Sequence, residues 1–382
     1  MKIGIPKEIR AGETRVALIP PMIAGLIRDG HEVLVESGAG VGAGFADTAY
    51  QDAGASIIDD AAKLYTNADL IMKVNAPTFN PTTKKHEADL LKNGTTYVGF
   101  LMPQENKDAV EKMVRKKITC FAMEFVPRIT RAQSMDALSS MATIAGYKAV
   151  IIAAEKLSKI FPLLMTAAGS ITPANVLILG AGVAGLQAIA TAKRLGAKVE
   201  AFDPRPAVKE QIESLGASFV EMQLPEEDVE TAGGYAKQQS DAFLKAEQDA
   251  IGKRLPRMDV VITTAQIFGK RAPILITRAM VEQMQPGAVI IDLAAEQGGN
   301  CELTAANEQV EAHGVTVIGV VNLPASVAYH ASQMYSKNIT NLFKHLYLAP
   351  EFILNFEDEI TNGACVVRDG AIINDVVKNL VQ

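Results

Sequence analysis

Three glycines in the segment GAGVAG have the spacing G-x-G-x-x-G, which is typical of a turn that holds a phosphate group. The residues before them, Val176 to Leu179, are all apolar, as expected for a parallel strand that is covered on both faces. Gly180 would permit a tight turn, Gly182 would let the backbone approach a pyrophosphate, and Gly185 would let the next helix pack on the strand. The free N–H groups at the start of that helix are suited to bind phosphates. The pattern therefore predicts a dinucleotide-binding site.

An acid and an arginine follow the next predicted strand, Lys198 to Phe202. The carboxylate of Asp203 would accept hydrogen bonds from ribose hydroxyls and repel a 2′-phosphate, which favours NAD over NADP. Arg205 leaves NADP open, because an arginine at this place can accept a 2′-phosphate. The predicted nucleotide contacts are Gly180, Gly182, Val183, Gly185, Asp203, Arg205, Tyr235, Thr264 and Ala265.

A second group of polar residues surrounds the start of a long helical pattern, Ser134 to Lys159. Its members of interest are Arg128, Gln133, Asp136 and Ser139. Such groups can hold a carboxamide, because an acid accepts from its NH2 while a hydroxyl or guanidinium donates to its carbonyl. They can equally form a helix cap, with Ser134 as the N-cap and Asp136 in the first turn. The residues alone leave both interpretations open.

The elements that would position these residues alternate between strand and helix, which is typical of an α/β fold with parallel sheets. Near the start of the chain we expect strands at Lys2 to Pro6, Glu32 to Glu36, Leu70 to Val74, Tyr97 to Leu101 and Ile118 to Phe125. In the middle of the chain we expect six, at Val176 to Leu179, Lys198 to Phe202, Ser218 to Glu221, Val260 to Thr264, Val289 to Leu293 and Val315 to Val321. We therefore predict two Rossmann-like, doubly wound domains.

The nucleotide-binding domain is expected over 137–329, inserted in a discontinuous first domain made of 1–136 and 330–382. The cofactor would bind in the cleft between them. Residues 222–257 are rich in charge and glycine where such a sheet normally has a short connection. We expect a mobile loop there, with Gly233 and Gly234 as a hinge and Tyr235 near its tip. A passive solvated insertion is the other interpretation.

Composition limits the possible partners. Of the 382 residues 48% are hydrophobic and 21% charged, and the net charge is −6 without a basic tract, which argues against nucleic acid. The three cysteines are far apart and lack metal-ligand spacing, so we expect a reducing cytosol and no metal site. No apolar stretch reaches the roughly 20 residues needed to span a bilayer before a lysine interrupts it. We therefore expect no membrane span.

Several segments together resemble one known family. KIGIPKEIRAGETRVALIP at the start, GAGVGAGFADTAYQDAGASI, IIDLAAEQGGN and NLPASVAYHASQMYSKNI are similar to alanine dehydrogenases and proton-translocating nicotinamide nucleotide transhydrogenases. The resemblance covers nearly the whole chain. It implies the same discontinuous two-domain plan.

The alanine dehydrogenase branch must move protons on an amine and a carbonyl, so it needs an acid/base group and a clamp for a carboxylate. By resemblance the clamp would be Arg15 and Lys73. That branch also has a histidine and an aspartate at two positions where this sequence has Gly99 and Glu296. Loss of the histidine removes the most obvious proton shuttle.

The transhydrogenase branch needs no acid or base, because hydride passes directly between two nicotinamides. The resemblance implies that Arg128, Gln133, Asp136 and Ser139 orient the nicotinamide of NADH. It also implies that Gln133 reaches towards NADP(H) on a partner subunit. The mobile loop with Tyr235 would close over bound nucleotide.

The sequence ends at Gln382 without membrane helices, so it resembles a separate NAD(H)-binding subunit. The resemblance implies a homodimer that docks on a membrane-embedded proton-channel subunit and an NADP(H)-binding subunit, with Si-Re specific hydride transfer. The chain would then be cytoplasmic and peripheral on the inner face of the cell membrane. The alternatives are a soluble alanine dehydrogenase and a non-catalytic NAD-sensing module.

Overall fold

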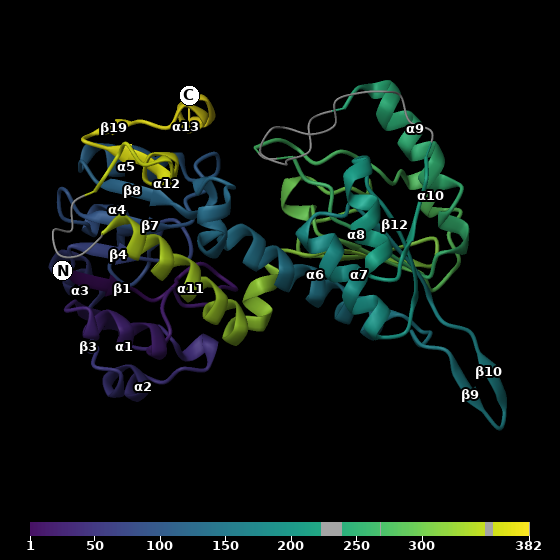
Figure 1. Ribbon diagram of the computed structural model, residues 1–382, viewed down its shortest axis with the longest axis horizontal. Helices are drawn as coiled ribbons and strands as arrows, with labels where there is room; N and C mark the ends of the chain where they lie inside the picture. The colour runs from purple at the N-terminus through teal and green to yellow at the C-terminus, as the bar shows by residue number, and fades with distance from the viewer. Residues whose placement is uncertain (223–238, 268, 348–353, 382) are drawn as a thin grey trace. The chain divides into compact units, whose positions relative to one another are not determined.

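The computed structural model describes residues 1–222, 239–267, 269–347 and 354–381. The chain divides into two compact units (Figure 1). Unit 1 comprises Met1–Met141 and Pro324–Gln382, and unit 2 comprises Ala142–Leu323. Unit 1 is thus built from both ends of the chain.

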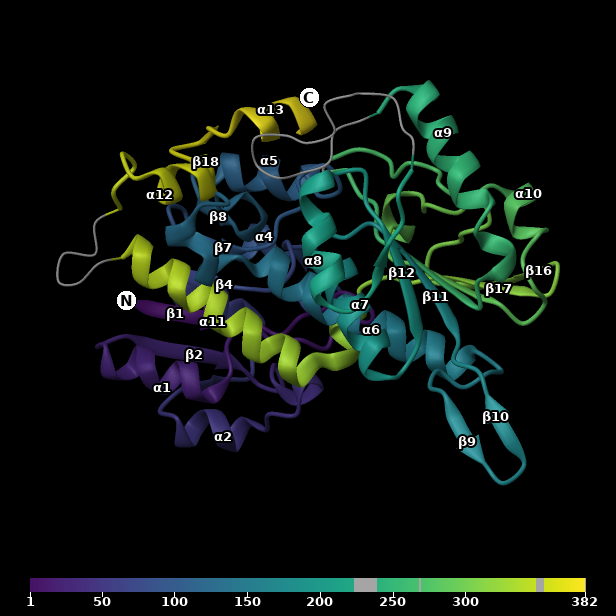
Figure 2. The same ribbon diagram turned by 45° about the vertical axis from the view of Figure 1, so that its right-hand side comes forward.

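Unit 1 contains an eight-stranded sheet in the order β19-β18-β8-β7-β4-β1-β2-β3 (Figure 2). Its strands are β1 (Lys2–Ile5), β2 (Glu32–Glu36), β3 (Ser56–Ile58), β4 (Leu70–Met72), β7 (Thr96–Gly99), β8 (Thr119–Ala122), β18 (Cys365–Arg368) and β19 (Ala371–Ile372). The first six of these in chain order pair in parallel, whereas β18 is antiparallel to β8 and β19 is antiparallel to β18. The C-terminal segment therefore completes the sheet of the first unit.

Helices accompany this sheet, and a small hairpin, β5 (Phe79–Asn80) with β6 (Lys85–His86), lies apart from it. The helices are α1 (Pro20–Arg28), α2 (Asp47–Asp52), α3 (Ala61–Asn67), α4 (Glu87–Leu90), α5 (Lys107–Arg115), α11 (Ala328–Leu346), α12 (Glu359–Ala364) and α13 (Asp375–Val381). Short 3-10 helices occur at η1 (Val41–Ala43), η2 (Met123–Phe125), η3 (Thr130–Met135) and η7 (Leu323–Val327). Buried apolar side chains such as Leu34, Ile71 and Val110 join strands and helices in one core.

Unit 2 contains a seven-stranded sheet in the order β13-β12-β11-β14-β15-β17-β16. Its strands are β11 (Asn175–Leu179), β12 (Lys198–Phe202), β13 (Ser218–Phe219), β14 (Val260–Thr263), β15 (Val289–Asp292), β16 (Gln309–Ala312) and β17 (Val315–Gly319). The six predicted strands are parallel in the order of a dinucleotide-binding Rossmann fold, and β16 adds an antiparallel edge. The expected fold class is confirmed.

The sheet of unit 2 is covered on both faces. Val176 and Ile178 of β11 pack in one buried cluster, whereas Leu177 and Leu179 pack in another. Alternate side chains of a strand point to opposite faces, so an unbroken apolar run is what a doubly covered strand requires. The helices of this unit are α7 (Val183–Arg194), α8 (Lys209–Ser214), α9 (Asp241–Gly252) and α10 (Arg278–Val281), with 3-10 helices η4 (Pro206–Val208), η5 (Leu255–Arg257) and η6 (Ala295–Gln297).

The long helix α6 (Ala137–Lys156) starts three residues later and ends three residues earlier than the predicted 134–159. Among the described residues it is the one helix long and apolar enough to cross a membrane, with a mean hydropathy of 1.5. An apolar helix in the core of a soluble protein meets the same criteria, and Ala149, Val150 and Ala153 are fully buried. Length and composition alone therefore do not assign α6 to a bilayer.

The segment predicted as a mobile loop, 222–257, is partly helical. Helix α9 begins at Asp241, where the side chain of Ser240 accepts a hydrogen bond from the N–H of Phe243 and caps it. Phe243 and Ile251 are buried in the unit. The second half of the segment is thus an ordinary packed helix, while Gly233, Gly234 and Tyr235 lie outside the described residues.

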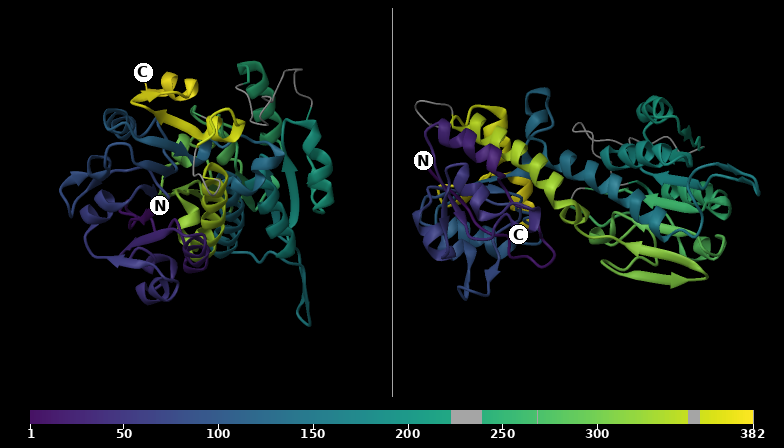
Figure 3. Two further views of the ribbon diagram at one scale, coloured as in Figure 1. Left: turned by 60° about the vertical axis from the view of Figure 1, so that its left-hand side comes forward. Right: turned by 90° about the horizontal axis from the view of Figure 1, so that it is seen from below.

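A hairpin of β9 (Leu164–Thr166) and β10 (Gly169–Ile171) projects from the body of unit 2 (Figures 1 and 3). All six of its strand residues are exposed. Leu164, Met165 and Ile171 are between 43% and 79% exposed. The hairpin therefore presents apolar side chains away from the core of its unit.

Candidate functional site

The glycine turn connects β11 to α7, and each glycine meets a different physical constraint. Gly180 has φ +95°, a left-handed conformation that side chains disfavour. A Cβ added at Gly185 would lie 1.9 Å from the carbonyl oxygen of Gly180, so only glycine lets the helix approach the strand. Gly182 differs, because a Cβ there would meet nothing within 4 Å. The backbone at Gly182 is therefore open to an approaching group.

The start of α7 offers backbone donors beside that open backbone. Gly182 is its N-cap residue and supplies no capping side chain. Gly182 is exposed and Val183, the first helical residue, is 39% exposed. Free N–H groups and the helix dipole together favour an anion at such a terminus. The geometry fits the pyrophosphate of a dinucleotide.

Asp203 lies at the end of β12 and is 4% exposed. One of its oxygens accepts from the N–H of Ala181 at 2.7 Å, which ties the acid to the glycine turn. The same carboxylate accepts from Nε of Arg205 at 2.8 Å and from a terminal guanidinium nitrogen at 2.9 Å. The arginine is thus oriented by the acid beside it, and the pair can offer both an acceptor and a donor to a ribose.

Thr264 and Ala265 follow β14 and lie against the same turn. The hydroxyl of Thr264 donates to the carbonyl of Gly180 at 3.1 Å. A Cβ on Gly180 would lie only 2.5 Å from that hydroxyl oxygen, so this close approach of Thr264 requires a glycine at position 180. These two predicted residues therefore form a wall of the nucleotide-binding turn.

Asn300, a residue that sequence reasoning missed, supports this wall. Its side chain is fully buried: Oδ1 accepts from the N–H of Ala265, and Nδ2 donates to the carbonyls of Ala265 and Pro273. Asp292, also fully buried, accepts from the N–H of Asn300 at 2.7 Å and from the hydroxyl of Thr304 at 2.6 Å. The signal available in the sequence was a polar residue directly after two glycines.

The second predicted group lies in unit 1, in the segment from the end of β8 to the first turn of α6. Asp136 accepts from the N–H of Ser139 at 2.8 Å and from its hydroxyl at 2.6 Å. Asp136 therefore caps α6, and the predicted N-cap Ser134 lies instead in η3, because the helix starts at Ala137. The acid is thus itself the helix cap, in place of Ser134, and the carboxamide-binding interpretation stays a prediction. Arg128 and Gln133 have exposed side chains.

The two groups belong to different units. The glycine turn, Asp203, Arg205, Thr264 and Ala265 are brought together within unit 2, whereas Arg128, Gln133, Asp136 and Ser139 lie within unit 1. Tyr235 lies outside the described residues. Over the described ranges, no cluster of three or more His, Cys, Asp or Glu side chains could hold a metal ion.

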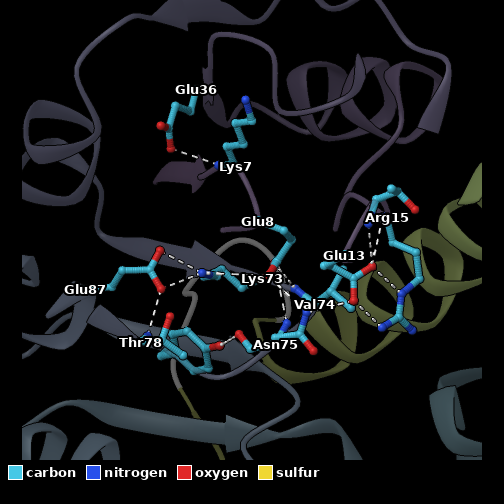
Figure 4. A network of polar contacts seen from close by, with 12 residues as sticks. Lys7, Glu8, Glu13, Arg15, Glu36, Lys73, Val74, Asn75, Thr78 and Glu87 are labelled. Carbon is cyan, nitrogen blue, oxygen red and sulfur yellow. Dashed lines mark hydrogen bonds and ion pairs between the residues drawn. The ribbon is translucent and has the colours of Figure 1, made fainter. Parts of the chain in front are cut away.

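Arg15 and Lys73, the possible carboxylate clamp, are paired with carboxylates of the chain itself (Figure 4). Arg15 contacts Glu13 at 2.6 Å through a terminal nitrogen and at 2.8 Å through Nε. Burial would raise the pKa of Glu13, but Arg15 and Asn75 lower it to about 2. The guanidinium of Arg15 therefore faces a permanently ionised partner.

Lys73 is 1% exposed, and its ammonium lies 2.7 Å from both oxygens of Glu87. A second carboxylate, that of Glu8, lies 3.8 Å away. Burial disfavours the charge, yet Glu8 and Glu87 raise the pKa of Lys73 above its ordinary value. Glu87, which sequence reasoning also missed, pairs with the lysine from the start of α4 (Figure 4).

Position 99 has no room for a side chain. A Cβ added at Gly99 would lie 2.7 Å from the carbonyl oxygen of Lys73 and 2.9 Å from the hydroxyl of Tyr97. Tyr97 is fully buried and donates to the carbonyl of Asn75 at 2.6 Å, so it is held in place. A histidine at this position would require the strands to move. Glu296, in η6, is exposed.

Comparison with known proteins places the chain in a family. The family model described as "Alanine dehydrogenase/PNT, N-terminal domain" matches residues 4–145, and that described as "Alanine dehydrogenase/PNT, C-terminal domain" matches residues 149–375. The chain belongs to the alanine dehydrogenase/PNT family. It is 48% identical to an NAD(P) transhydrogenase subunit alpha polypeptide of Rhodospirillum rubrum, over 98% of each chain.

Solved structures agree with this family membership. A transhydrogenase from Sinorhizobium meliloti matches with a TM-score of 0.86 and 39% identity, over 97% of this chain and 100% of that one. An L-alanine dehydrogenase matches with a TM-score of 0.80 and 28% identity, over 100% of this chain and 99% of that one. Both proteins share the fold, and the sequence is more similar to the transhydrogenase.

The resemblance to alanine dehydrogenases implies a histidine at position 99, where this chain has glycine. Reductive amination needs a group that moves a proton, and Gly99 supplies none. The neighbouring strand ends are packed around the glycine without space for a replacement. The structure therefore agrees with the sequence similarity in favouring the transhydrogenase branch.

Proposed function

We propose that this chain is the NAD(H)-binding subunit of a proton-translocating transhydrogenase. It would transfer hydride directly from NADH to NADP+ held by a partner subunit. The observation that carries this proposal is the packing around Gly99, because it leaves no room there for the histidine that, by resemblance, would serve an alanine dehydrogenase as proton shuttle. Hydride transfer between two nicotinamides has no such requirement, since no proton moves in that step.

The chain's own residues would bind and orient NADH, which supplies the hydride. The open backbone at Gly182 and the start of α7 would bind its pyrophosphate, and Asp203 would accept from a ribose hydroxyl. Arg128, Gln133, Asp136 and Ser139 would orient its nicotinamide. The capping bonds between Asp136 and Ser139 leave lone pairs of the carboxylate for a carboxamide NH2.

The proposed assembly places NADP(H) on a separate subunit and the proton channel in a membrane-embedded one. The chain would be cytoplasmic and peripheral on the inner face of the membrane, held there by those partners. Hydride transfer would be Si-Re specific, and efficient only when both nucleotide-binding subunits are present. The name of the Rhodospirillum rubrum relative, which calls it a subunit, supports an enzyme of several chains.

We further propose that the working form is a homodimer, with the β9–β10 hairpin as part of the interface. Leu163, Leu164, Met165 and Ile171 are each at least 43% exposed on this hairpin. An isolated two-stranded hairpin is only marginally stable in water, so it needs a surface to cover its apolar side chains. A second copy of the chain can supply that surface.

One assay separates this proposal from its alternatives. The purified chain is mixed with NADH and either pyruvate plus ammonia, or NADP+ with the isolated NADP(H)-binding subunit of a transhydrogenase. We expect oxidation of NADH only in the second mixture. Oxidation with pyruvate and ammonia would show an alanine dehydrogenase instead, and tight NADH binding without turnover in either mixture would favour a nucleotide sensor.

A further inference from the structure

The segment that carries Gln133 is attached to the rest of unit 1 at two points. The 3-10 helix η3 covers Thr130–Met135, and within it Ala132 and Met135 are buried while Gln133 is exposed. One attachment lies at Arg131 and the other at Ser134. The two points bracket Gln133 closely, so they limit where its side chain can be presented.

The attachment at Ser134 comes from α11. The carbonyl oxygen of Ser134 accepts from Nδ2 of Asn338 at 2.9 Å and from Nδ2 of Asn341 at 3.1 Å. The two asparagines are three positions apart and so lie on the same face of the helix. A carbonyl that receives two side-chain donors from a rigid helix is fixed in direction as well as in position.

The attachment at Arg131 comes from the start of α12. Both terminal nitrogens of Arg131 donate to Oδ2 of Asp358, at 3.1 and 3.2 Å. The other oxygen, Oδ1, accepts from the N–H of Ile360 at 2.9 Å and lies 2.7 Å from Nε2 of His345. These contacts hold the pKa of Asp358 well below its ordinary value, although burial alone would raise it. The acid therefore stays ionised as an anchor for the arginine.

Asn338 bonds to Ser134 but leaves one of its own atoms unsatisfied. The side chain is 6% exposed, and among the described residues its Oδ1 is buried without a hydrogen-bond partner. A buried acceptor in that state is unfavourable, and an apolar side chain of the same shape would avoid this cost. The hydrogen bond that the Asn338 side chain donates goes to the Ser134 carbonyl, so its polar contact serves the η3 segment.

We propose that Asn338, Asn341 and Asp358 are positioning residues that hold the η3 segment from behind, so that Gln133 is presented in one orientation for hydride transfer. The inference rests on the proposed function, because that function gives Gln133 its role. None of the three residues needs to touch a nucleotide. They act through the backbone of 131–134, which they fix at both ends.

The test compares two buried, apolar replacements on the same helix. Asn338→Leu removes the bond to Ser134 while keeping the branching and the number of side-chain heavy atoms. Thr340→Val is the matched control. Thr340 is also 6% exposed, and among the described residues its buried hydroxyl has no hydrogen-bond partner, so it does not contact η3. Asn341→Ala is the milder second variant, since its side chain is partly exposed and its loss leaves no cavity.

Each variant is mixed with the isolated NADP(H)-binding subunit, and single-turnover hydride transfer, the Kd for NADH and the unfolding midpoint are measured. We expect Asn338→Leu to slow transfer at least 10-fold and Asn341→Ala several-fold. Both should change the Kd for NADH by less than 2-fold, and Asn338→Leu should unfold no earlier than wild type. Thr340→Val should match wild type in transfer rate and in Kd, and it should also unfold no earlier than wild type. Equal transfer rates in Asn338→Leu and Thr340→Val would overturn the inference.

Amide hydrogen exchange of residues 130–136 keeps this inference separate from the proposed function. We expect faster exchange in Asn338→Leu than in Thr340→Val. If wild type itself transfers no hydride to NADP+ on the partner, the proposed function fails, whatever the exchange shows. If wild type does transfer, unchanged exchange in Asn338→Leu would show that Asn338 does not hold the segment and would also overturn the inference.

Discussion

At the nucleotide-binding turn, the sequence pattern alone predicts which positions must be glycine. The conformation of Gly180 and the contact of Gly185 with the Gly180 carbonyl both follow from the G-x-G-x-x-G spacing. Asn300 and Glu87 could not be found in this way. Asn300 contacts Ala265 and Glu87 contacts Lys73 across distances in the sequence that no local pattern spans, and only the folded sheet brings them together.

The first prediction separates the two functions of the glycines. Gly182→Ala should leave the unfolding temperature close to wild type, because the added methyl meets nothing, yet should weaken NADH binding at least 10-fold by obstructing the pyrophosphate. Gly185→Ala is the contrasting variant and should destabilise the protein by about 1 to 3 kcal/mol or more through overpacking. Thermal unfolding and NADH titration measure both. Unchanged NADH affinity in Gly182→Ala would remove the turn from the binding site.

The second prediction concerns Gln133. Gln133→Asn shortens an exposed side chain without touching the buried residues of η3, so folding should be unaffected. Hydride transfer to NADP+ on the partner should slow by at least 10-fold, because the reacting rings must approach to about 3 to 3.5 Å. The Kd for NADH should change far less. Equal losses in rate and affinity would instead assign Gln133 to nucleotide binding alone.

At the scale of elements, the strands with apolar runs and the short edge strand β13 were predictable, whereas other short or edge strands were not. The six parallel strands of unit 2 were expected, whereas β3 and β16 are only partly buried and lack a clear pattern. Strand β18 is buried, but it lies in a polar C-terminal region and gains its partner, β8, only through the fold. Helix α9 was missed because its charged residues resembled a solvated loop.

The third prediction concerns the connection that follows β7. The buried carboxylate of Glu124 accepts from the N–H groups of Leu101 and Met102 at 3.0 and 2.7 Å. Burial raises the pKa of Glu124 from its ordinary 4.5 to about 7. Between pH 4.5 and about pH 7 the folded protein therefore binds more protons than the unfolded chain. The free energy of unfolding falls as pH rises through this range and levels off above about pH 7.

Glu124→Gln is neutral at every pH and should remove this dependence. Between pH 4.5 and about pH 8, wild type should lose up to about 3 kcal/mol of unfolding free energy relative to the variant. Urea unfolding of both proteins across that range measures the difference, in which all other titrating groups cancel. Parallel stability curves for the two proteins would show that Glu124 does not titrate in this window.

At the scale of the whole molecule, the chain consists of two sheet units, one made from both chain ends, and an apolar hairpin that projects from the second. The nucleotide turn lies in unit 2 and the Gln133 segment in unit 1, so the proposed chemistry needs both units. Subunits that cover the hairpin and supply NADP(H) would complete the assembly. On this proposal, the molecule binds NADH and works together with other chains.

The fourth prediction concerns the hairpin. Met165 is 79% exposed, so Met165→Glu costs the isolated chain almost nothing. At the proposed interface between two copies it would bury an unpaired charge, which is strongly unfavourable. Sedimentation should show a dimer for wild type and a monomer for the variant, with Gln211→Glu, at an exposed position on α8, as the control. A dimer in both proteins would place the interface on another surface.

The most direct test of the central claim follows the hydride itself. NADH carrying deuterium at the transferred C4 position is mixed in ordinary water with this chain, NADP+ and the NADP(H)-binding subunit. Direct transfer without an acid or base predicts that the label appears in full in NADPH and that the rate is independent of solvent deuteration. Loss of the label to water, or its appearance in alanine when pyruvate and ammonia are present, would contradict the account.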